Sequence, residues 1–328
     1  MYHVAVIGHG YWGRNIARVF NSSPDFSLKC VCDCSPPALA EARALYPAAV
    51  AVPNIDEIPA DINVVAVITP VGERLSIAER FLNAGKHVLV TKPSTLRAIE
   101  TDSLIALAER KGVAFFVDNT FVFNPAVIAL KNILPKIGKP YFTVSQRMNL
   151  GRFQSDMNVI FDLMPHDVAI LSYLFEANVT QANTTAVHSA GLPQEDLAHS
   201  TFLLDNNVHG LVTVSWLAPM KVRKLFVVGQ DGMLTYDDVA VSEKVCFYDK
   251  GLRVDADTPP DPANLYTARI SYRAGDMYSP AIANREALEI EMGEFAQAIR
   301  DEKVRRSYNK LNSLIMRNLE KLALARRL

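Results

Sequence analysis

Over the first 120 residues, short runs of apolar and β-branched residues alternate with longer stretches in which apolar residues recur every three or four positions. The short runs predict strands, and the longer stretches predict amphipathic helices. Regular alternation of the two is typical of βαβ units in a parallel sheet. The predicted strands are residues 3–7, 28–33, 64–69, 87–91 and 114–118.

Glycines support this division. Gly85 and Gly112 each follow the last periodic residue of a predicted helix and lead directly into the next predicted strand. The residue that ends a helix often has a left-handed conformation, which glycine adopts most easily. We therefore expect both helices to end at these two positions.

Beyond about Asn124 the pattern changes. One or two helices are followed, from about Asn178 to Tyr248, by runs in which apolar and polar residues alternate with a period of two. This period, with turn sequences between the runs, predicts an antiparallel or mixed sheet with one covered face. The last segment is helical again, with apolar stripes on residues 288–299 and 311–323. We predict an α/β protein with a doubly wound parallel sheet in residues 1–120 and an α+β domain with a large open, mostly antiparallel sheet in residues 121–328.

Composition excludes several classes of protein. The length of 328 residues exceeds the ~250–300 at which one hydrophobic core usually stops growing, which favours two domains. The 34 basic and 35 acidic side chains leave no overall positive field for nucleic acid or an acidic membrane. No secretory signal and no apolar stretch near the ~20 residues of a membrane span is visible, so we expect a cytoplasmic protein. Three of the four cysteines, Cys30, Cys32 and Cys34, have a spacing that fits neither a metal site nor a disulfide framework, and we expect no metal.

A glycine-rich sequence joins the first predicted strand to the first predicted helix. Gly8, Gly10 and Gly13 have G-x-G-x-x-G spacing, with Tyr11 and Trp12 before the last of them. In this context the first glycine permits a tight turn, the second lets a pyrophosphate approach the backbone, and the third lets helix and strand pack closely. The helix N-terminus then attracts the phosphates. The sequence therefore predicts a Rossmann domain that binds a dinucleotide.

The choice of dinucleotide depends on the end of the second predicted strand. Asp33 lies there, 20 residues after Gly13. A carboxylate at this position can accept hydrogen bonds from the ribose hydroxyls of NAD and would repel the 2′-phosphate of NADP. We predict NAD as the cofactor, with NADP as the alternative.

A lysine follows the predicted strand 87–91, at the sheet edge where ligands bind in doubly wound folds. The Lys92 ammonium could hydrogen-bond a substrate hydroxyl or carbonyl and stabilise negative charge on that oxygen. Pro93 predicts a constrained turn and permits a cis peptide bond. An ordinary surface turn is the structural alternative.

A second group of polar residues precedes an apolar helical pattern, in the sequence Asp162-Leu163-Met164-Pro165-His166-Asp167. Pro165 suits a first helical turn, which would place His166 at the positive end of the helix and keep its ring neutral, as a general base requires. Asp162 could orient this ring or receive its proton. The structural alternative is a capping aspartate with a packed histidine. For Asp167 we expect only a favourable first-turn charge.

Together these elements resemble the oxidoreductase family of glucose-fructose oxidoreductase, inositol dehydrogenase and MocA, abbreviated Gfo/Idh/MocA. The resemblance extends over nearly the whole chain and is carried by residues 4–13, 67–70, 84–90, 92–93, 123–126, 162–166 and 288–299. It implies a Rossmann domain followed by an α+β domain that binds substrate and forms a homo-oligomer, either a dimer or a tetramer. It also implies hydride transfer between NAD(P) and a ring hydroxyl or ketone of a sugar, nucleotide sugar or cyclitol.

The resemblance assigns roles to individual residues. It implies that Lys92, Asp162 and His166 are catalytic. The predicted cofactor contacts are Gly8, Gly10, Tyr11, Trp12, Gly13, Asp33, Thr69, Pro70, Lys92 and Pro93. The predicted substrate contacts are Lys92, Asn119, Arg147, Arg152, Asp162 and His166. Of these, Arg147 and Arg152 could hold an anionic group such as a phosphate, with a solvated surface position as the alternative. The segment 149–154 is most similar to the branch that acts on sugars and nucleotide sugars.

Three departures from the family pattern leave other readings open. Thr91 stands where the family usually has Glu, Arg74 stands where it commonly has His, and residues 158–160 replace paired glycines. We expect altered contacts to the nicotinamide ribose and a differently shaped pocket floor. The alternatives to an alcohol dehydrogenase are a dinucleotide-binding sensor or scaffold without activity, and a reductase of imines or ring double bonds. The presence of Lys92 favours alcohol chemistry.

Overall fold

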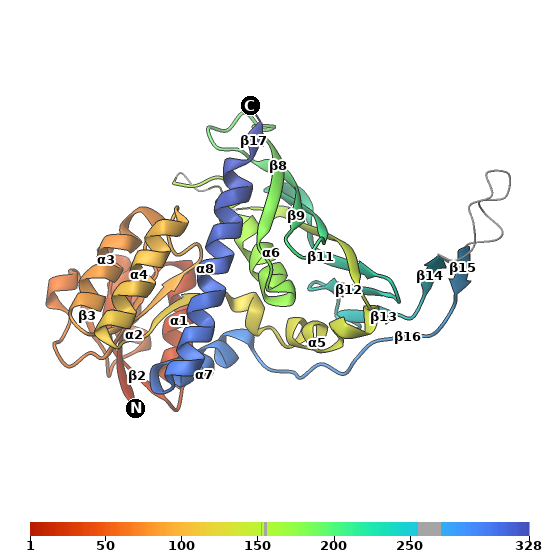
Figure 1. The fold of residues 1–328 in the computed structure, drawn as a ribbon. Helices are drawn as coiled ribbons and strands as arrows, with labels where there is room; N and C mark the ends of the chain where they lie inside the picture. Colours follow the sequence, from red (N-terminus) through yellow and green to blue (C-terminus); the bar gives the residue numbers. More distant parts are fainter. Residues whose placement is uncertain (152, 154–155, 255–269, 328) are drawn as a thin grey trace. The chain divides into compact units, whose positions relative to one another are not determined.

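The computed structural model describes residues 1–151, 153, 156–254 and 270–327 (Figure 1). The chain divides into two compact units. The first comprises Met1–Asn124 and Arg285–Glu320, and the second comprises Pro125–Asn284 and Lys321–Leu328.

The first unit is built on a six-stranded parallel sheet with the order β3-β2-β1-β4-β5-β6. Its strands are β1 (Tyr2–Ile7), β2 (Phe26–Cys32), β3 (Val50–Val52), β4 (Val64–Val67), β5 (His87–Thr91) and β6 (Phe115–Asp118). Its helices are α1 (Tyr11–Ser22), α2 (Pro36–Leu45), α3 (Val71–Asn83), α4 (Ala98–Lys111), α7 (Ala287–Arg300) and most of α8 (Glu302–Leu324), with short 3₁₀ turns η1 (Ile55–Glu57) and η2 (Thr120–Phe123). The strand order reverses between β1 and β4, and this switch point is where doubly wound sheets bind ligands. The predicted Rossmann-type sheet is confirmed.

The sequence pattern explains these elements. The central strands are continuous apolar runs because helices cover both faces of the sheet, and Val4, Ala5 and Val6 are fully buried. Helices α3 and α4 lie side by side (Figure 1). Gly85 follows α3 with a φ of +73°, and Gly112 ends α4 with a φ of +68°, as predicted.

The first unit also contains α7, which lies beyond the predicted domain boundary at residue 120. The Phe295 ring lies 5.7 Å from that of Phe26 and 5.1 Å from that of Phe116, between centroids. Both partners belong to the parallel sheet. A contiguous boundary at residue 120 therefore differs from the observed division, because an apolar helix stripe does not reveal which sheet it will cover.

The second unit is built on a nine-stranded mixed sheet with the order β16-β13-β12-β11-β7-β10-β9-β8-β17. Its strands are β7 (Pro140–Leu150), β8 (Val179–Val187), β9 (Leu197–Leu204), β10 (His209–Ser215), β11 (Leu217–Gly229), β12 (Met233–Asp237), β13 (Val245–Tyr248), β16 (Met277–Tyr278) and β17 (Arg326–Arg327). Most neighbours are antiparallel, whereas β10 pairs with β7, and β17 with β8, in parallel. A separate ribbon is formed by β14 (Gly251–Val254) and β15 (Ile270–Arg273) (Figure 1).

Helices cover part of this sheet. They are α5 (Pro125–Ile133), the 3₁₀ turn η3 (Leu134–Ile137) and α6 (Val159–Phe175), which packs against β7, β9 and β10. The period-two run of β10 buries Val212 and Val214 completely, so the predicted mixed sheet with a covered face is confirmed. Of the helices in the described ranges, none combines the length and apolar character that crossing a bilayer demands.

Candidate active site

The glycine loop between β1 and α1 has the geometry that a dinucleotide site needs. Gly8 has a φ of +93°, and a Cβ there would lie 2.8 Å from the Ile68 carbonyl oxygen. A Cβ on Gly13 would lie 1.9 Å from the Gly8 carbonyl oxygen. A Cβ on Gly10 would meet nothing within 4 Å, and no side chain caps α1 at this position. Two of the glycines are therefore required by close packing, while Gly10 leaves open the helix end that phosphates approach.

The Asp33 carboxylate is fixed beside this loop. Its Oδ2 accepts a hydrogen bond from the His9 N–H at 2.6 Å, and its Oδ1 accepts one from the Ser35 N–H at 2.8 Å. Each carboxylate oxygen can accept more than one hydrogen bond, so ribose hydroxyls can bind without displacing these donors.

Trp12 connects the loop to the far edge of the sheet. Its indole N–H donates to the Asp118 carboxylate at the end of β6, and the Thr120 hydroxyl donates to the other oxygen of the same carboxylate. Glu291 of α7 is fully buried, and this burial together with the charge of Asp118 raises the pKa of Glu291 well above its usual range. The indole N–H of Trp12 is therefore bound to Asp118 within the first unit.

The remaining predicted contacts of the first unit follow the carboxyl ends of adjacent strands. Thr69 and Pro70 follow β4, and Pro70 is the N-cap residue of α3. Lys92, which is half-buried, follows β5, and the Lys92–Pro93 peptide bond is cis. Because β1, β4 and β5 are neighbours in the sheet, the glycine loop and Lys92 lie along one sheet edge.

Asn119 follows β6 but is turned inward. It is 6% exposed, and its amide donates to the Asn312 side chain of α8 at 3.0 Å. This contact ties α8 to the sheet. We therefore do not propose Asn119 as a substrate contact.

Helix α6 carries the other predicted catalytic residues, and it begins earlier than expected. Asn158 is its N-cap, and the Asn158 side chain accepts a hydrogen bond from the Phe161 N–H at 3.1 Å. Pro165 lies inside the helix, so the prediction that it occupies the first turn is wrong. His166 accordingly lies beyond the first turn, where the field of the helix end is weak. The prediction placed the helix start at Pro165 because proline is common in a first helical turn, and Asn158 was not recognised as the N-cap.

Asp162 and His166 lie four residues apart on α6 and share a face of the helix. Both are half-buried. The Trp216 indole N–H donates to Asp162 Oδ2 at 2.9 Å, and Trp216 itself is fully buried. This partner was not predicted from the sequence, although a buried tryptophan in a period-two run needs an acceptor for its N–H.

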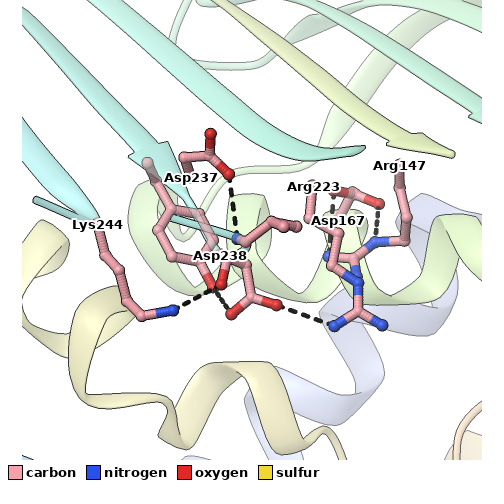
Figure 2. A network of polar contacts seen from close by, with 8 residues as sticks. Arg147, Asp167, Arg223, Asp237, Asp238 and Lys244 are labelled. Atoms are coloured by element: carbon pink, nitrogen blue, oxygen red, sulfur yellow. Dashed lines mark hydrogen bonds and ion pairs between the residues drawn. The ribbon is translucent and has the colours of Figure 1, made fainter. Parts of the chain in front are cut away.

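The two arginines predicted to bind an anion have different outcomes. Arg147 on β7 is 1% exposed, and its Nε lies 2.7 Å from Asp167 Oδ2 (Figure 2). The Ser145 hydroxyl donates to the other oxygen of Asp167 at 2.6 Å. Asp167 is thus half of a buried ion pair between α6 and β7, and the prediction that it is only a first-turn charge is wrong. We do not propose Arg147 as a substrate contact, and Arg152 lies outside the described residues.

A second ion pair lies beside the first (Figure 2). Arg223 of β11 is paired in register with Arg147 of β7, and its Nη1 lies 2.9 Å from Asp238 Oδ2. The Tyr236 hydroxyl donates to Asp238 at 3.0 Å, and burial together with this carboxylate raises the pKa of Tyr236 well above its usual range. Like charges opposite each other in a sheet destabilise it, so each arginine needs its own carboxylate.

The match to known families covers both units. A family model described as an oxidoreductase family with an NAD-binding Rossmann fold matches residues 2–119. A model described as the GFO/IDH/MocA C-terminal domain matches residues 142–235.

Individual relatives agree with these matches. The chain is 26% identical over 295 residues to UDP-N-acetylglucosamine 3-dehydrogenase of Acidithiobacillus ferrooxidans, covering 90% of this chain and 87% of that protein. The solved structure of that enzyme has a TM-score of 0.79 at 22% identity and covers 99% of this chain and 98% of its own. The chain is also 26% identical over 294 residues to scyllo-inositol 2-dehydrogenase (NADP(+)) IolU of Bacillus subtilis, covering 82% of this chain and 86% of that protein. The structure of GenD2 from gentamicin A biosynthesis, in complex with NAD, has a TM-score of 0.80 at 20% identity and covers 99% of this chain and 93% of its own.

Proposed function

The protein belongs to the Gfo/Idh/MocA family of NAD(P)-dependent oxidoreductases, and from this premise we propose that it oxidises a ring hydroxyl, or reduces the corresponding ketone, of a sugar, nucleotide sugar or cyclitol. The observation that carries the proposal is the placement of Lys92 on the same sheet edge as the glycine loop. An ammonium group at that edge can hydrogen-bond an oxygen on the carbon that exchanges hydride with the cofactor.

Three residues divide the chemistry. In the oxidative direction Lys92 donates to the reacting oxygen and stabilises its negative charge, and His166 accepts the proton that this oxygen loses. Asp162 orients the His166 ring, and Trp216 in turn holds the Asp162 carboxylate. When bound, NAD supplies the hydride acceptor.

The cofactor preference follows from Asp33. Its carboxylate lies at the end of β2 beside the glycine loop, where it would accept hydrogen bonds from two free ribose hydroxyls and repel a 2′-phosphate. We therefore propose NAD as the preferred cofactor.

The substrate we place first is a nucleotide sugar. The support is the relative that acts on UDP-N-acetylglucosamine, whose alignment extends over 90% of this chain. Scyllo-inositol, which the Bacillus subtilis relative is named for, is likewise a polyhydroxylated ring. A cyclitol is therefore the second substrate class to test.

The same relationship supports a proposal about where the protein acts and how it assembles. We propose a cytoplasmic homo-oligomer, either a dimer or a tetramer. Cys30 and Cys32 are buried free thiols, and burial raises the pKa of the first to about 12 and of the second to about 11. Free thiols fit a reducing compartment. Light scattering on a sizing column tests the oligomer, and a monomer at all concentrations would contradict it.

The direct test of the function is a panel of nucleotide sugars, free sugars and cyclitols, assayed with NAD⁺ and NADP⁺ for reduced cofactor. We expect turnover with at least one nucleotide sugar in wild type and its loss in Lys92→Ala. Lys86→Ala is the matched control, because Lys86 lies just before the same strand, is half-buried like Lys92, and donates its Nζ hydrogen bond to the Ala60 carbonyl. Cofactor binding without turnover on any member of the panel would instead favour a sensor or scaffold.

A further inference from the structure

A buried arginine lies at the Lys92 turn. Arg74 extends from the first turn of α3 and is 7% exposed. Its Nε donates to the Thr69 carbonyl at 2.8 Å. Its Nη1 donates to the carbonyls of Thr91 at 3.1 Å, Lys92 at 3.2 Å and Pro93 at 2.6 Å. One side chain therefore holds three consecutive carbonyls of the turn and one carbonyl of the neighbouring loop.

The chemistry of guanidinium suits this task. The group is planar, permanently charged and carries five N–H donors in fixed directions. Three carbonyls converge on one nitrogen, so they share its hydrogens, and the shortest contact goes to Pro93. A neutral imidazole, by comparison, has a single N–H donor and could hold only one of these carbonyls. Arg74 therefore gives this turn more hydrogen bonds than a side chain with a single donor could.

The side chain of Thr91, in the same turn, does not supply such contacts. The Thr91 hydroxyl is buried and has no hydrogen-bond partner among the described residues. Its side chain therefore does not fix the turn. Arg74 bonds the backbone on both sides of Lys92, which leaves mainly the side-chain torsions of Lys92 free to vary.

We propose that Arg74 is a positioning residue for Lys92. It fixes the backbone from which the lysine projects, and through Thr69 it couples this turn to the loop after β4. The inference rests on the proposed function, because it assumes that the Lys92 ammonium contacts the reacting oxygen. A positioned group loses catalytic power when its backbone shifts, even where its chemistry is unchanged.

Kinetics of Arg74→Met, Arg74→Lys and the control Arg80→Met test this role. Arg80 lies on the same helix, is exposed and pairs with Asp56 at the surface. We expect Arg74→Met to lower kcat by about 10²-fold, with little change in NAD(H) affinity. Arg74→Lys should recover part of the loss, and Arg80→Met should stay within about twofold of wild type.

A double variant distinguishes positioning from general damage. If Arg74 acts through Lys92, adding Arg74→Met to Lys92→Ala should lower the residual rate by no more than about twofold. A full additional loss in this background would overturn the proposal. So would an active wild type whose kcat is unchanged by Arg74→Met.

Hydrogen exchange provides a readout that needs no substrate. We expect the peptide covering residues 91–97 to exchange faster in Arg74→Met, or in Arg74→Lys if the first variant does not fold, and not in Arg80→Met. Unchanged exchange would overturn the proposal. A wild type that is inactive on every substrate would overturn the proposed function, and the exchange data would still decide whether Arg74 holds the turn.

Discussion

Each unit of the molecule contains a buried arginine, and the two are held differently. Arg74 donates to backbone carbonyls, whereas Arg147 pairs with the Asp167 carboxylate. Removing Arg74 leaves carbonyl dipoles that can rearrange or bind water. Removing Arg147 or its partner leaves a full charge in the interior, which costs far more.

The difference separates positioning from stability. The contacts of Arg74 end on the turn that carries Lys92, so its loss should appear mainly in the rate. The contacts of Arg147 join α6 to β7, so its loss should appear mainly in the folding of the second unit. Variants that distinguish rate from stability therefore test the comparison directly.

The largest expected effect is on turnover. Lys92→Ala and His166→Ala should each lower kcat by roughly 10²–10⁴-fold, because each removes a group that acts on the reacting oxygen or its proton. NAD(H) affinity should stay nearly constant, since neither residue is assigned to the adenosine or pyrophosphate end. Steady-state kinetics with calorimetric cofactor titration measures both quantities. Wild-type turnover in either variant would remove that residue from the mechanism.

Breaking the buried ion pair should give the largest loss of stability. We expect Asp167→Ala to destabilise the second unit by about 3–5 kcal/mol, because it leaves the Arg147 charge without its carboxylate. Replacing both charged residues with apolar ones, as in the double variant Arg147→Met with Asp167→Leu, should restore much of that stability. Denaturant unfolding monitored by hydrogen exchange in β7 and α6 measures the change. A double variant as unstable as the single one would argue against an unpaired charge as the cause.

Much of the first unit could be predicted because its signals are local. The glycine loop needs three glycines within six positions, and Asp33 follows the next strand at a fixed interval. The backbone packs so closely at Gly8 and Gly13 that neither position has room for a Cβ atom. The glycines in the sequence pattern therefore reflect this close packing directly.

The second unit was harder to predict because its contacts join distant residues. Trp216 reaches Asp162 across 54 positions, and Arg147 reaches Asp167 across 20. No periodic pattern in the sequence indicates either pair. Which side chains meet depends on how the strands and helices pack in the folded chain. The start of α6 was misplaced for a related reason: a proline after an acidic residue has the pattern of a helix start, yet the cap is Asn158. The sequence showed that Arg74 differs from the residue expected by resemblance to the family. It did not predict the four backbone carbonyls to which Arg74 donates.

A smaller effect is expected at the cofactor. Asp33→Ala should weaken NAD binding by about tenfold, the equivalent of one good charge-assisted pair of hydrogen bonds, and should narrow the preference for NAD over NADP. Calorimetric titration of both cofactors measures the ratio, and Asp56→Ala, an exposed residue of η1, is the control. Tighter binding of NADP than of NAD by wild type would contradict the assignment of Asp33.

The smallest expected effect is on the free energy of unfolding at acidic pH, and it concerns Glu291. This residue tests whether buried side chains contribute to the stability of the first unit. Burial and the Asp118 carboxylate raise the pKa of Glu291 well above its usual range. A carboxyl whose pKa is higher in the folded than in the unfolded chain holds its proton more tightly when folded. Its contribution to stability is complete below the unfolded-state pKa of about 4.3 and is lost as the pH rises through the folded-state value.

Glu291→Gln replaces this carboxyl with an amide of similar shape that does not titrate. At acidic pH we expect it to change the free energy of unfolding by no more than about 1 kcal/mol. As the pH rises above about 4.3, the stability of wild type should decline more steeply than that of the variant, because only wild type loses the proton. Glu289→Gln, an exposed residue of the same helix, should follow wild type. Parallel stability curves for wild type and Glu291→Gln would show that folding does not raise the pKa of Glu291, and would contradict the retention of its proton beside Asp118.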